Sequence, residues 1–142
     1  MSPGKSPPRP PQEPEPATGP RVLLVDDDLQ ICTFLATLLE LEGMTPIVAR
    51  RPEDALAGLA GTAAVLLDVA MPGMDGLELC RRMRASGYAG PVIVVSARPG
   101  LDLPRRSLEA GANEFIRKPF ENAELLARLR HHLAASEPSP GR

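Results

Sequence analysis

Residues 65–76 read Val-Leu-Leu-Asp-Val-Ala-Met-Pro-Gly-Met-Asp-Gly, and this stretch decides the predicted fold. An apolar run ends in one carboxylate, Asp68, and a loop containing proline and glycine follows it. A buried strand that closes on a polar residue is typical of an open α/β sheet, which presents its chemistry at the carboxyl ends of its strands. The stretch therefore predicts such a sheet with a site around Asp68.

Two further apolar runs and one strand-like run also end in polar residues. They are residues 22–25, 92–95 and 113–117, which are followed by Asp26-Asp27-Asp28, by Ser96 and by Lys118-Pro119. Because the carboxyl ends of parallel strands meet at one edge of a sheet, we expect these acids, the hydroxyl and the lysine to converge. This set of side chains predicts a magnesium-dependent phosphoacceptor site.

The bulk composition favours one folded domain flanked by disordered ends. The chain has 142 residues, and eight of the first twenty are proline, which predicts a disordered arm over residues 1–20. We expect a folded unit over residues 21–135 and a disordered tail over 136–142. The net charge of −2 gives no electrostatic case for nucleic-acid binding. Since no apolar stretch reaches membrane-spanning length and no signal peptide is visible, we expect a cytoplasmic protein.

Apolar runs alternate with amphipathic stretches, which is typical of repeated βα units and a parallel sheet. The expected strands are 21–26, 45–49, 63–68, 91–96 and 113–117, and the expected helices are 29–42, one opening at Pro52, 75–86 and 121–135. The buried face of the second helix should consist of Ala55, Leu56 and Leu59. A short fourth helix is predicted from about Pro104 to Ala110, because proline is tolerated only in the first turn of a helix.

The cysteines and the paired histidines are not predicted to form sites. Cys32 and Cys80 fall at apolar positions of helix-like segments, which favours buried thiols over a disulfide or a metal site. His131 and His132 are adjacent in sequence, so they do not share a helix face, and metal binding there is not expected.

Each residue of the predicted site also has a plainer interpretation. Two adjacent carboxylates, Asp26 and Asp27, repel each other, and a hard divalent cation relieves that repulsion; alternatively, Asp27 or Asp28 simply caps the first helix. Asp68 is predicted to be the nucleophile that forms an acyl phosphate. Its plainer interpretation is a strand-end carboxylate that caps a turn, which would leave Asp26, Asp27 and Lys118 unexplained. In the same way, Ser96 is either a donor to a phosphoryl oxygen or a turn hydroxyl, and Lys118 is either a phosphate-pairing charge or a surface lysine.

Four ordered motifs resemble the receiver domain of two-component response regulators. They are Val25-Asp26-Asp27-Asp28, Leu67-Asp68 with residues 71–76, Val95-Ser96-Ala97, and residues 111–115 with Lys118-Pro119-Phe120. The resemblance covers Arg21 to about Leu133. It implies a three-layer, flavodoxin-like, doubly wound α/β fold with a five-stranded parallel sheet in the order 2-1-3-4-5 and five helices.

The resemblance also implies roles for single residues. Asp68 would accept a phosphoryl group from a phosphohistidine on a sensor histidine kinase or a histidine phosphotransfer protein. Asp27, Asp68 and the backbone carbonyl of Ala70 would hold Mg²⁺ directly, and Asp26 would act largely through water. Ser96 and Lys118 would bind the phosphoryl group. Phe115 would be the switch aromatic that turns inward as Ser96 moves, and Pro119 is a candidate for a cis peptide bond. The implied protein is a signalling switch and not an enzyme.

Departures from the family pattern concern the output. No segment after residue 135 is predicted to fold, so output is expected through protein contact at the fourth helix, fifth strand and fifth helix, or through phosphate relay. Glu114 and Arg128 are candidates for a pair across a homodimer that uses this surface, although Pro104 replaces a basic residue there. In the family that the chain resembles, the positions of Ala70 and Arg98 influence how water reaches the acyl phosphate, so these two residues are candidates for that role.

Two other classes of function stay open. In a haloacid-dehalogenase-like phosphatase, Asp26 would be the nucleophile and Asp28 the acid, but Gln30 is atypical and Asp68 would have no role. In a pseudo-receiver, the chain would be a binding module that is never phosphorylated. Such modules generally lose an acid or the lysine, and both are present here.

Overall fold

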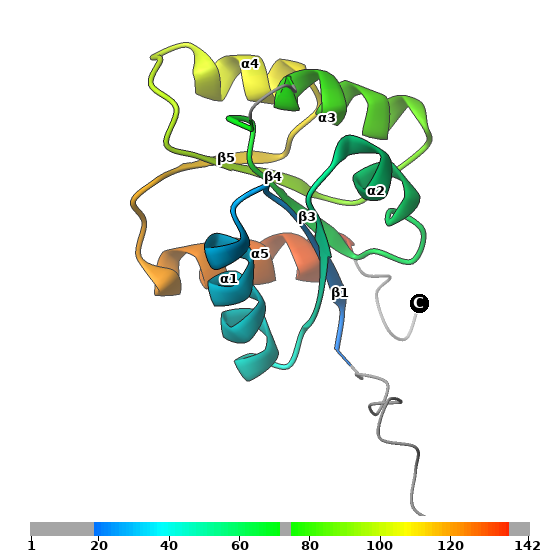
Figure 1. Cartoon of the computed structure of the whole chain (residues 1–142), viewed down its shortest axis with the longest axis vertical. Helices are drawn as coiled ribbons and strands as arrows, with labels where there is room; N and C mark the ends of the chain where they lie inside the picture. The colour runs from blue at the N-terminus through cyan, green and yellow to red at the C-terminus, as the bar shows by residue number, and fades with distance from the viewer. Residues whose placement is uncertain (1–18, 72–74, 137–142) are drawn as a thin grey trace, which may run out of the picture.

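The computed structural model describes residues 19–71 and 75–136, which form five strands and five helices in alternation (Figure 1). The strands are β1 (Arg21–Val25), β2 (Thr45–Ala49), β3 (Ala64–Leu67), β4 (Val92–Ser96) and β5 (Glu114–Arg117). The helices are α1 (Leu29–Leu41), α2 (Pro52–Ala57), α3 (Gly76–Ala85), α4 (Leu103–Glu109) and α5 (Asn122–Ser136). The predictions for residues 1–18, 72–74 and 137–142 lie outside the described residues.

All five strands are parallel, in the order β2-β1-β3-β4-β5, as the sequence predicted. Every residue of β3 and β4 is buried, and so is every residue of β1 except Arg21. Central strands of a parallel sheet read as continuous apolar runs because helices cover both of their faces. The order reverses direction between β1 and β3, and their carboxyl ends are where such a sheet binds ligands.

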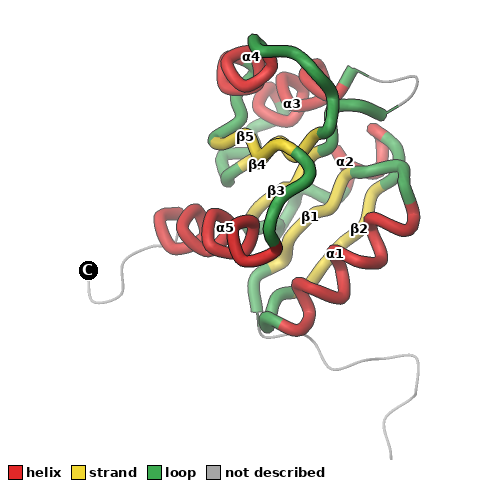
Figure 2. The backbone as a smooth tube through the Cα atoms, turned by 90° about the vertical axis from the view of Figure 1, so that its left-hand side faces the viewer, coloured by secondary structure: helices red, strands yellow, loops and turns green. Residues whose placement is uncertain are grey.

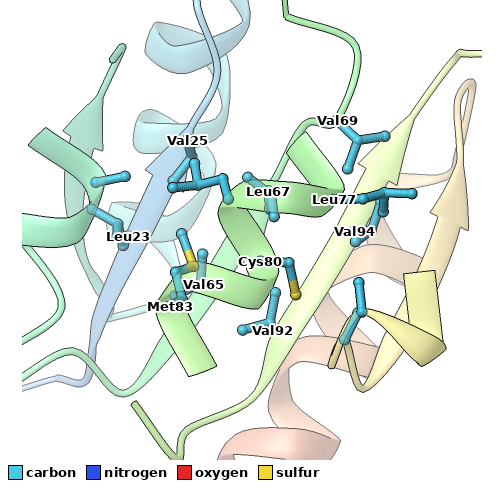
Figure 3. Close-up of a cluster of buried hydrophobic side chains, with 14 of the residues drawn as sticks. Leu23, Val25, Val65, Leu67, Val69, Leu77, Cys80, Met83, Val92 and Val94 are labelled. Carbon is cyan, nitrogen blue, oxygen red and sulfur yellow. The ribbon is translucent and has the colours of Figure 1, made fainter. Parts of the chain in front are cut away.

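The helices form a layer on each side of the sheet. Figures 1 and 2 show α1 and α5 on one face and α2, α3 and α4 on the other. Leu23 and Val25 of β1 join the core under α2–α4, which Figure 3 shows, whereas Val22 and Leu24 join the core under α1 and α5. Successive side chains of a strand point to opposite faces, so one strand supplies both cores.

Short polar caps set where the two helices beside the site begin. The carboxylate of Asp28 accepts hydrogen bonds from the backbone N–H groups of Gln30 and Ile31 at 2.9 and 3.3 Å. The carboxylate of Asp75 does the same for α3. Such caps satisfy N–H groups that have no partner inside the helix. Of the two candidates for the cap of α1, the structure therefore selects Asp28.

Several predicted boundaries need small corrections. The second helix ends at Ala57, so Leu59 is buried but lies beyond the helix to which it was assigned. The first and third strands end at Val25 and Leu67, each one residue before the acid that was predicted to close it. α5 extends to Ser136, one residue into the predicted tail.

The short fourth helix is confirmed. It spans Leu103–Glu109, and Pro104 sits in its first turn, where a missing backbone N–H costs no helical hydrogen bond. Residues 97–102 form the irregular loop that was predicted before it. The buried hydroxyl of Ser107 donates to the carbonyl of Leu103 at 2.8 Å, which satisfies the hydroxyl inside the helix.

Candidate functional site

Three of the predicted site residues meet at the carboxyl edge of the sheet. The Nζ atom of Lys118 lies 3.6 Å from Oδ2 of Asp26 and 3.5 Å from Oδ2 of Asp68. These residues follow β5, β1 and β3, so the parallel topology brings together side chains that are far apart in sequence. The backbone N–H of Asp68 also donates to the carbonyl of Val25 at 2.9 Å, which holds the two acid-bearing strand ends side by side.

Asp26 is the buried member of the cluster, with 5% of its surface exposed. Burial raises the pKa of its carboxyl group, and the negative charge of Asp68 raises that pKa further. A hydrogen bond from the backbone N–H of Asp28, at 2.9 Å, and the charge of Lys118 partly oppose this rise in pKa. Asp26 therefore carries an electrostatic cost in its ionised form, which a positive ion in the site would reduce.

Asp68 is more accessible than Asp26, with 13% of its side chain exposed against 8% for Asp26. Its Oδ1 atom accepts a hydrogen bond from the backbone N–H of Ala70 at 2.9 Å. Its Oδ2 atom points to Lys118. One oxygen is thus fixed by the backbone that follows β3, and the other lies within reach of a positive charge, an arrangement that suits a nucleophilic carboxylate.

Ser96 closes β4 on the other side of Asp68 and is fully buried. Its Oγ atom accepts a hydrogen bond from the backbone N–H of Arg98 at 3.0 Å, and its carbonyl accepts one from the backbone N–H of Lys118 at 2.9 Å. The second bond joins the end of β4 to Lys118, whose ammonium group pairs with Asp26 and Asp68. The peptide bond between Lys118 and Pro119 is cis, as the sequence analysis anticipated.

A metal ion would find oxygen ligands in this cluster. Among residues 19–71 and 75–136, no group of three or more His, Cys, Asp or Glu side chains is arranged to hold a metal ion. Mg²⁺ needs only one or two carboxylates, because water and phosphate oxygens complete its shell. Within the part of the chain that the structure describes, Lys118 is the cation that pairs with both Asp26 and Asp68, so two carboxyl groups share one positive charge. This chemistry fits Mg²⁺.

Asp27 follows the buried Asp26 directly in the chain. It is exposed, and its backbone carbonyl accepts a hydrogen bond from the guanidinium of Arg50 at 3.4 Å. Arg50 follows β2 and was not singled out in the sequence, because no motif distinguishes it from an ordinary loop arginine. The role of Asp27 as a direct metal ligand stays a prediction, as does that of the Ala70 carbonyl.

Phe115 and its neighbour Arg117 occupy one face of β5. Phe115 is half-buried against the core under α2–α4, and the guanidinium of Arg117 lies 5.1 Å from the centre of its ring. Sequence reasoning found Phe115 but missed Arg117. The signal was available, since residues two apart on a strand share a face, but the reach of the arginine depends on the path of the loop after β4.

The candidate dimer pair is engaged within this chain. Glu114 forms an ion pair with Arg128 and a hydrogen bond with His132, whose Nε2 atom lies 2.7 Å from Oε1 of Glu114. Burial raises the pKa of the Glu114 carboxyl, but the His132 hydrogen bond and the Arg128 charge outweigh burial, so that the pKa lies below its ordinary value. Arg128 also contacts Glu124 at 3.2 Å. Any pairing of Glu114 across a dimer would compete with these contacts.

The two cysteines behave as predicted. Cys32 and Cys80 are buried free thiols, and burial raises the pKa of each. The Cys32 thiol donates to the backbone carbonyl of Asp26 at 3.3 Å, so this side chain supports the site from beneath without taking part in it.

A doubly wound parallel sheet with an Asp–Asp–Lys cluster at its switch point defines the class of receiver domains. A sequence model of that class, described as the response regulator receiver domain, matches residues 22–130. The chain belongs to this family, as the resemblance of its motifs had indicated.

Proteins of known sequence agree with the family assignment. Response regulator MprA of Mycobacterium sp. (strain KMS) is 39% identical over 123 residues, which are 85% of this chain and 54% of the relative. Response regulator MprA of Mycobacterium avium (strain 104) is 38% identical over 120 residues, 83% of this chain and 53% of the relative. The chain thus spans about half the length of the curated relatives it matches.

Solved structures resemble the whole folded unit. The receiver domain of the Francisella response regulator 1452 has a TM-score of 0.78 at 29% identity and covers 84% of this chain and all of its own. The BeF3-activated N-terminal receiver domain of Klebsiella pneumoniae RstA has a TM-score of 0.75 at 36% identity, over 80% of this chain and 97% of its own. Within the described residues, no helix has the length and apolar character needed to cross a membrane.

Proposed function

We propose that this receiver domain is a phosphorylation switch that accepts a phosphoryl group on Asp68 from a phosphohistidine. The observation that carries the proposal is the position of Lys118, whose Nζ atom lies within 3.6 Å of one oxygen of Asp26 and one of Asp68. A lysine held between two acids at the carboxyl edge of a sheet can pair with a phosphoryl oxygen once the group has been transferred.

The reaction replaces one bond to phosphorus by another. An oxygen of the ionised Asp68 carboxylate attacks phosphorus, the bond between phosphorus and the imidazole nitrogen of the donor breaks, and that nitrogen leaves with the electron pair. Ser96 and Lys118 would then donate to oxygens of the transferred group. The chain is changed by the transfer and does not turn over an external substrate, so we propose a signalling role and not an enzyme.

Mg²⁺ is the cofactor that we propose, held directly by Asp27, Asp68 and the carbonyl of Ala70, with Asp26 acting largely through water. When bound, it would neutralise charge on the transferring oxygens. The pKa of Asp26, raised by burial and by the charge of Asp68, supports this role, and among the described residues the two acids share the positive charge of Lys118.

The phosphodonor would be a histidine kinase or a histidine phosphotransfer protein in the cytoplasm. An apolar groove of about 470 Å³ lies next to Lys118, and Ile31, Phe34 and Phe120 contribute to its lining. Phe34 of α1 is half exposed, so part of its ring is open to solvent at this groove. A partner that presents a phosphohistidine on an apolar helix surface would cover this groove and bring the donor nitrogen to Asp68.

Output would use the surface formed by α4, β5 and α5, through a protein partner, a homodimer or a phosphate relay. Ser96 and Phe115 are the proposed switch, since Ser96 borders the site and Phe115 lies on the strand that leads to this surface. Ala70 and Arg98 flank Asp68 and Ser96, and we propose that they influence the lifetime of the acyl phosphate.

The two competing functions have less support from the geometry. As a phosphatase acid, Asp28 would need a free carboxyl group, but its Oδ1 atom is engaged as the cap of α1. A pseudo-receiver would have no need for the close approach of Lys118 to both acids. The phosphatase alternative predicts that Asp68 can be replaced without loss of phosphorylation chemistry, whereas the pseudo-receiver alternative predicts that wild type is not phosphorylated at all.

Intact-protein mass spectrometry with acetyl phosphate tests the proposal. Wild type should gain one phosphoryl group in the presence of Mg²⁺ and none when EDTA is present. Asp68→Asn should gain none, and Asp54→Asn, which changes an exposed acid on α2, should behave like wild type. Transfer to Asp68→Asn, or a wild type that stays unmodified with both acetyl phosphate and a phosphorylated kinase domain, would overturn it.

A further inference from the structure

One side chain of β5, Arg117, connects three parts of the molecule around Ser96. Its guanidinium donates hydrogen bonds to the carbonyls of Arg98 and Gly100, at 2.7 and 3.0 Å. The same guanidinium lies 5.1 Å from the centre of the Phe115 ring. Arg98 and Gly100 belong to the loop between β4 and α4, so Arg117 joins that loop both to the strand and to the half-buried aromatic ring.

These contacts lead directly to the hydroxyl of Ser96. Ser96 is the register partner of Arg117 across the β4–β5 ladder. Arg98 is held twice, because its N–H donates to Ser96 Oγ at 3.0 Å and its carbonyl accepts from Arg117. If the Ser96 hydroxyl turned toward a group on Asp68, the Arg98 N–H would lose its acceptor, and Arg117 alone would oppose movement of the loop.

The contacts suit arginine in particular. Among residues 19–71 and 75–136, no carboxylate forms an ion pair with Arg117, so the loop carbonyls and the Phe115 ring account for its contacts. A guanidinium presents five N–H donors in a fixed planar fork and can also stack on an aromatic face. A lysine ammonium could reach one carbonyl, but it would not hold both carbonyls and cover the ring at the same time.

We propose that Arg117 is a positioning residue that acts through Ser96 and favours the loop conformation of this structure over the one that contacts a phosphoryl group. This inference rests on the proposed phosphoacceptor function of Asp68. If a group bound at Asp68 draws Ser96 away, the contacts of Arg117 must break. The loop before α4 is then released, and at the same time the guanidinium no longer covers the Phe115 ring. Arg117 therefore lowers the affinity of the site for such a group by the same factor by which it favours the present conformation of the loop and the output surface.

Beryllofluoride with Mg²⁺, which stands in for the phosphoryl group, provides the probe. Backbone amide resonances of Ala97, Gly100 and Leu101 should be recorded for the free and beryllofluoride-saturated wild type and for free Arg117→Ala. We expect the resonances of the free variant to be displaced toward the saturated wild-type positions. Its apparent affinity for beryllofluoride should be about five-fold higher than that of wild type.

Two further variants separate this role from a general loss of structure. Arg117→Lys keeps the charge, and its resonances should lie between those of wild type and Arg117→Ala. Arg81→Ala removes an exposed arginine of α3 that pairs with Glu78, and it should match wild type in both resonances and affinity. Thermal unfolding of every variant should show that each one is folded at the temperature of the titration.

Two results would overturn the proposal in distinguishable ways. If wild type responds to beryllofluoride but free Arg117→Ala keeps wild-type resonances and affinity, the role of Arg117 is wrong and the phosphoacceptor function stands. If wild type does not respond to beryllofluoride with Mg²⁺, the phosphoacceptor function is wrong, and the role of Arg117 is overturned with it.

Discussion

The side-chain oxygen of Asn113 accepts a hydrogen bond from the guanidinium of Arg84 at 2.8 Å and a second one from the backbone N–H of Val92 at 2.9 Å. Arg84 comes from α3, Val92 opens β4, and Asn113 precedes β5. Arg84 also donates to the carbonyls of Tyr88, Gly90 and Gly111. One arginine therefore joins α3 to the amino ends of two strands, at the sheet edge opposite to Asp68.

We predict that Arg84→Ala lowers the free energy of unfolding by about 2–3 kcal/mol, because it leaves three backbone carbonyls and one amide oxygen without a charged donor. Urea denaturation followed by circular dichroism measures this change. Arg82→Ala, at an exposed position of the same helix, should change stability by less than about 0.5 kcal/mol. Equal effects of the two variants would contradict this interpretation of Arg84.

Gly76 at the start of α3 should not tolerate a side chain. A Cβ atom there would lie 2.3 Å from the Cα atom of Val69, which follows Asp68. Gly76→Ala should lower the free energy of unfolding by about 2 kcal/mol, since backbone must move to make room. Because the nearest atom belongs to the backbone, the additional change Val69→Ala should not restore stability. Restoration in the double variant would show that only side-chain packing is at stake.

Asp26 should make the folded protein less stable at neutral pH. Its folded pKa is raised above the ordinary value of 3.8, so between these two values the folded state binds more protons than the unfolded state. Stability then falls as pH rises through this window. Without Mg²⁺, Asp26→Asn should be more stable than wild type at pH 7 by about 1 kcal/mol, and the gain should vanish below the ordinary pKa.

The control for Asp26 is Asp54→Asn, which changes an exposed acid and should leave stability unaltered at both pH values. Under the proposed function, Mg²⁺ should raise the melting temperature of wild type more than that of Asp26→Asn, since a ligand stabilises the state that binds it. An Asp26→Asn variant less stable than wild type at pH 7 would contradict the electrostatic argument.

Glu114 should act in the opposite direction. Its folded pKa lies below the ordinary value of 4.5, because His132 and Arg128 favour its ionised form more than burial disfavours it. The stability it contributes is present above 4.5 and is lost as pH falls through the folded pKa. Glu114→Gln should therefore cost about 1 kcal/mol at pH 7, and the cost should shrink when unfolding is measured at progressively lower pH.

An exposed acid provides the comparison for Glu114. Glu121→Gln, one residue before α5, should change stability little at any pH. A cost of Glu114→Gln that stays constant down to the lowest pH would show that packing of the side chain, and not its charge, is what the substitution removes.

The sequence was sufficient for the features that topology enforces. Parallel strands place their carboxyl ends at one edge, so the meeting of Asp26, Asp68 and Lys118 followed from the order of the apolar runs. The short fourth helix followed from Pro104, because the local effect of proline on a helix does not depend on tertiary contacts.

Other features depend on the path of the backbone in space. Whether Asp27 or Asp28 caps α1 depends on the residue at which the helix begins, and a shift of one residue would exchange them. Both acids are equally good caps, so the sequence does not distinguish them. The contacts of Arg84 and Arg117 go mostly to backbone carbonyls of loops, which any residue can provide. No sequence pattern marks such acceptors, so neither arginine could be distinguished from a solvent-exposed one.

The alternation of side chains along β1 makes the length of this short strand critical for both cores and for the site. Val22 and Leu24 face one helical layer, Leu23 and Val25 face the other, and Asp26 follows directly. Adding or deleting one residue here would exchange the contents of the two cores and turn the acid away from Lys118 in the same step. The spacing from Val22 to Asp26 is therefore constrained twice, by packing and by chemistry, and substitutions in β1 should be tolerated far better than changes in its length.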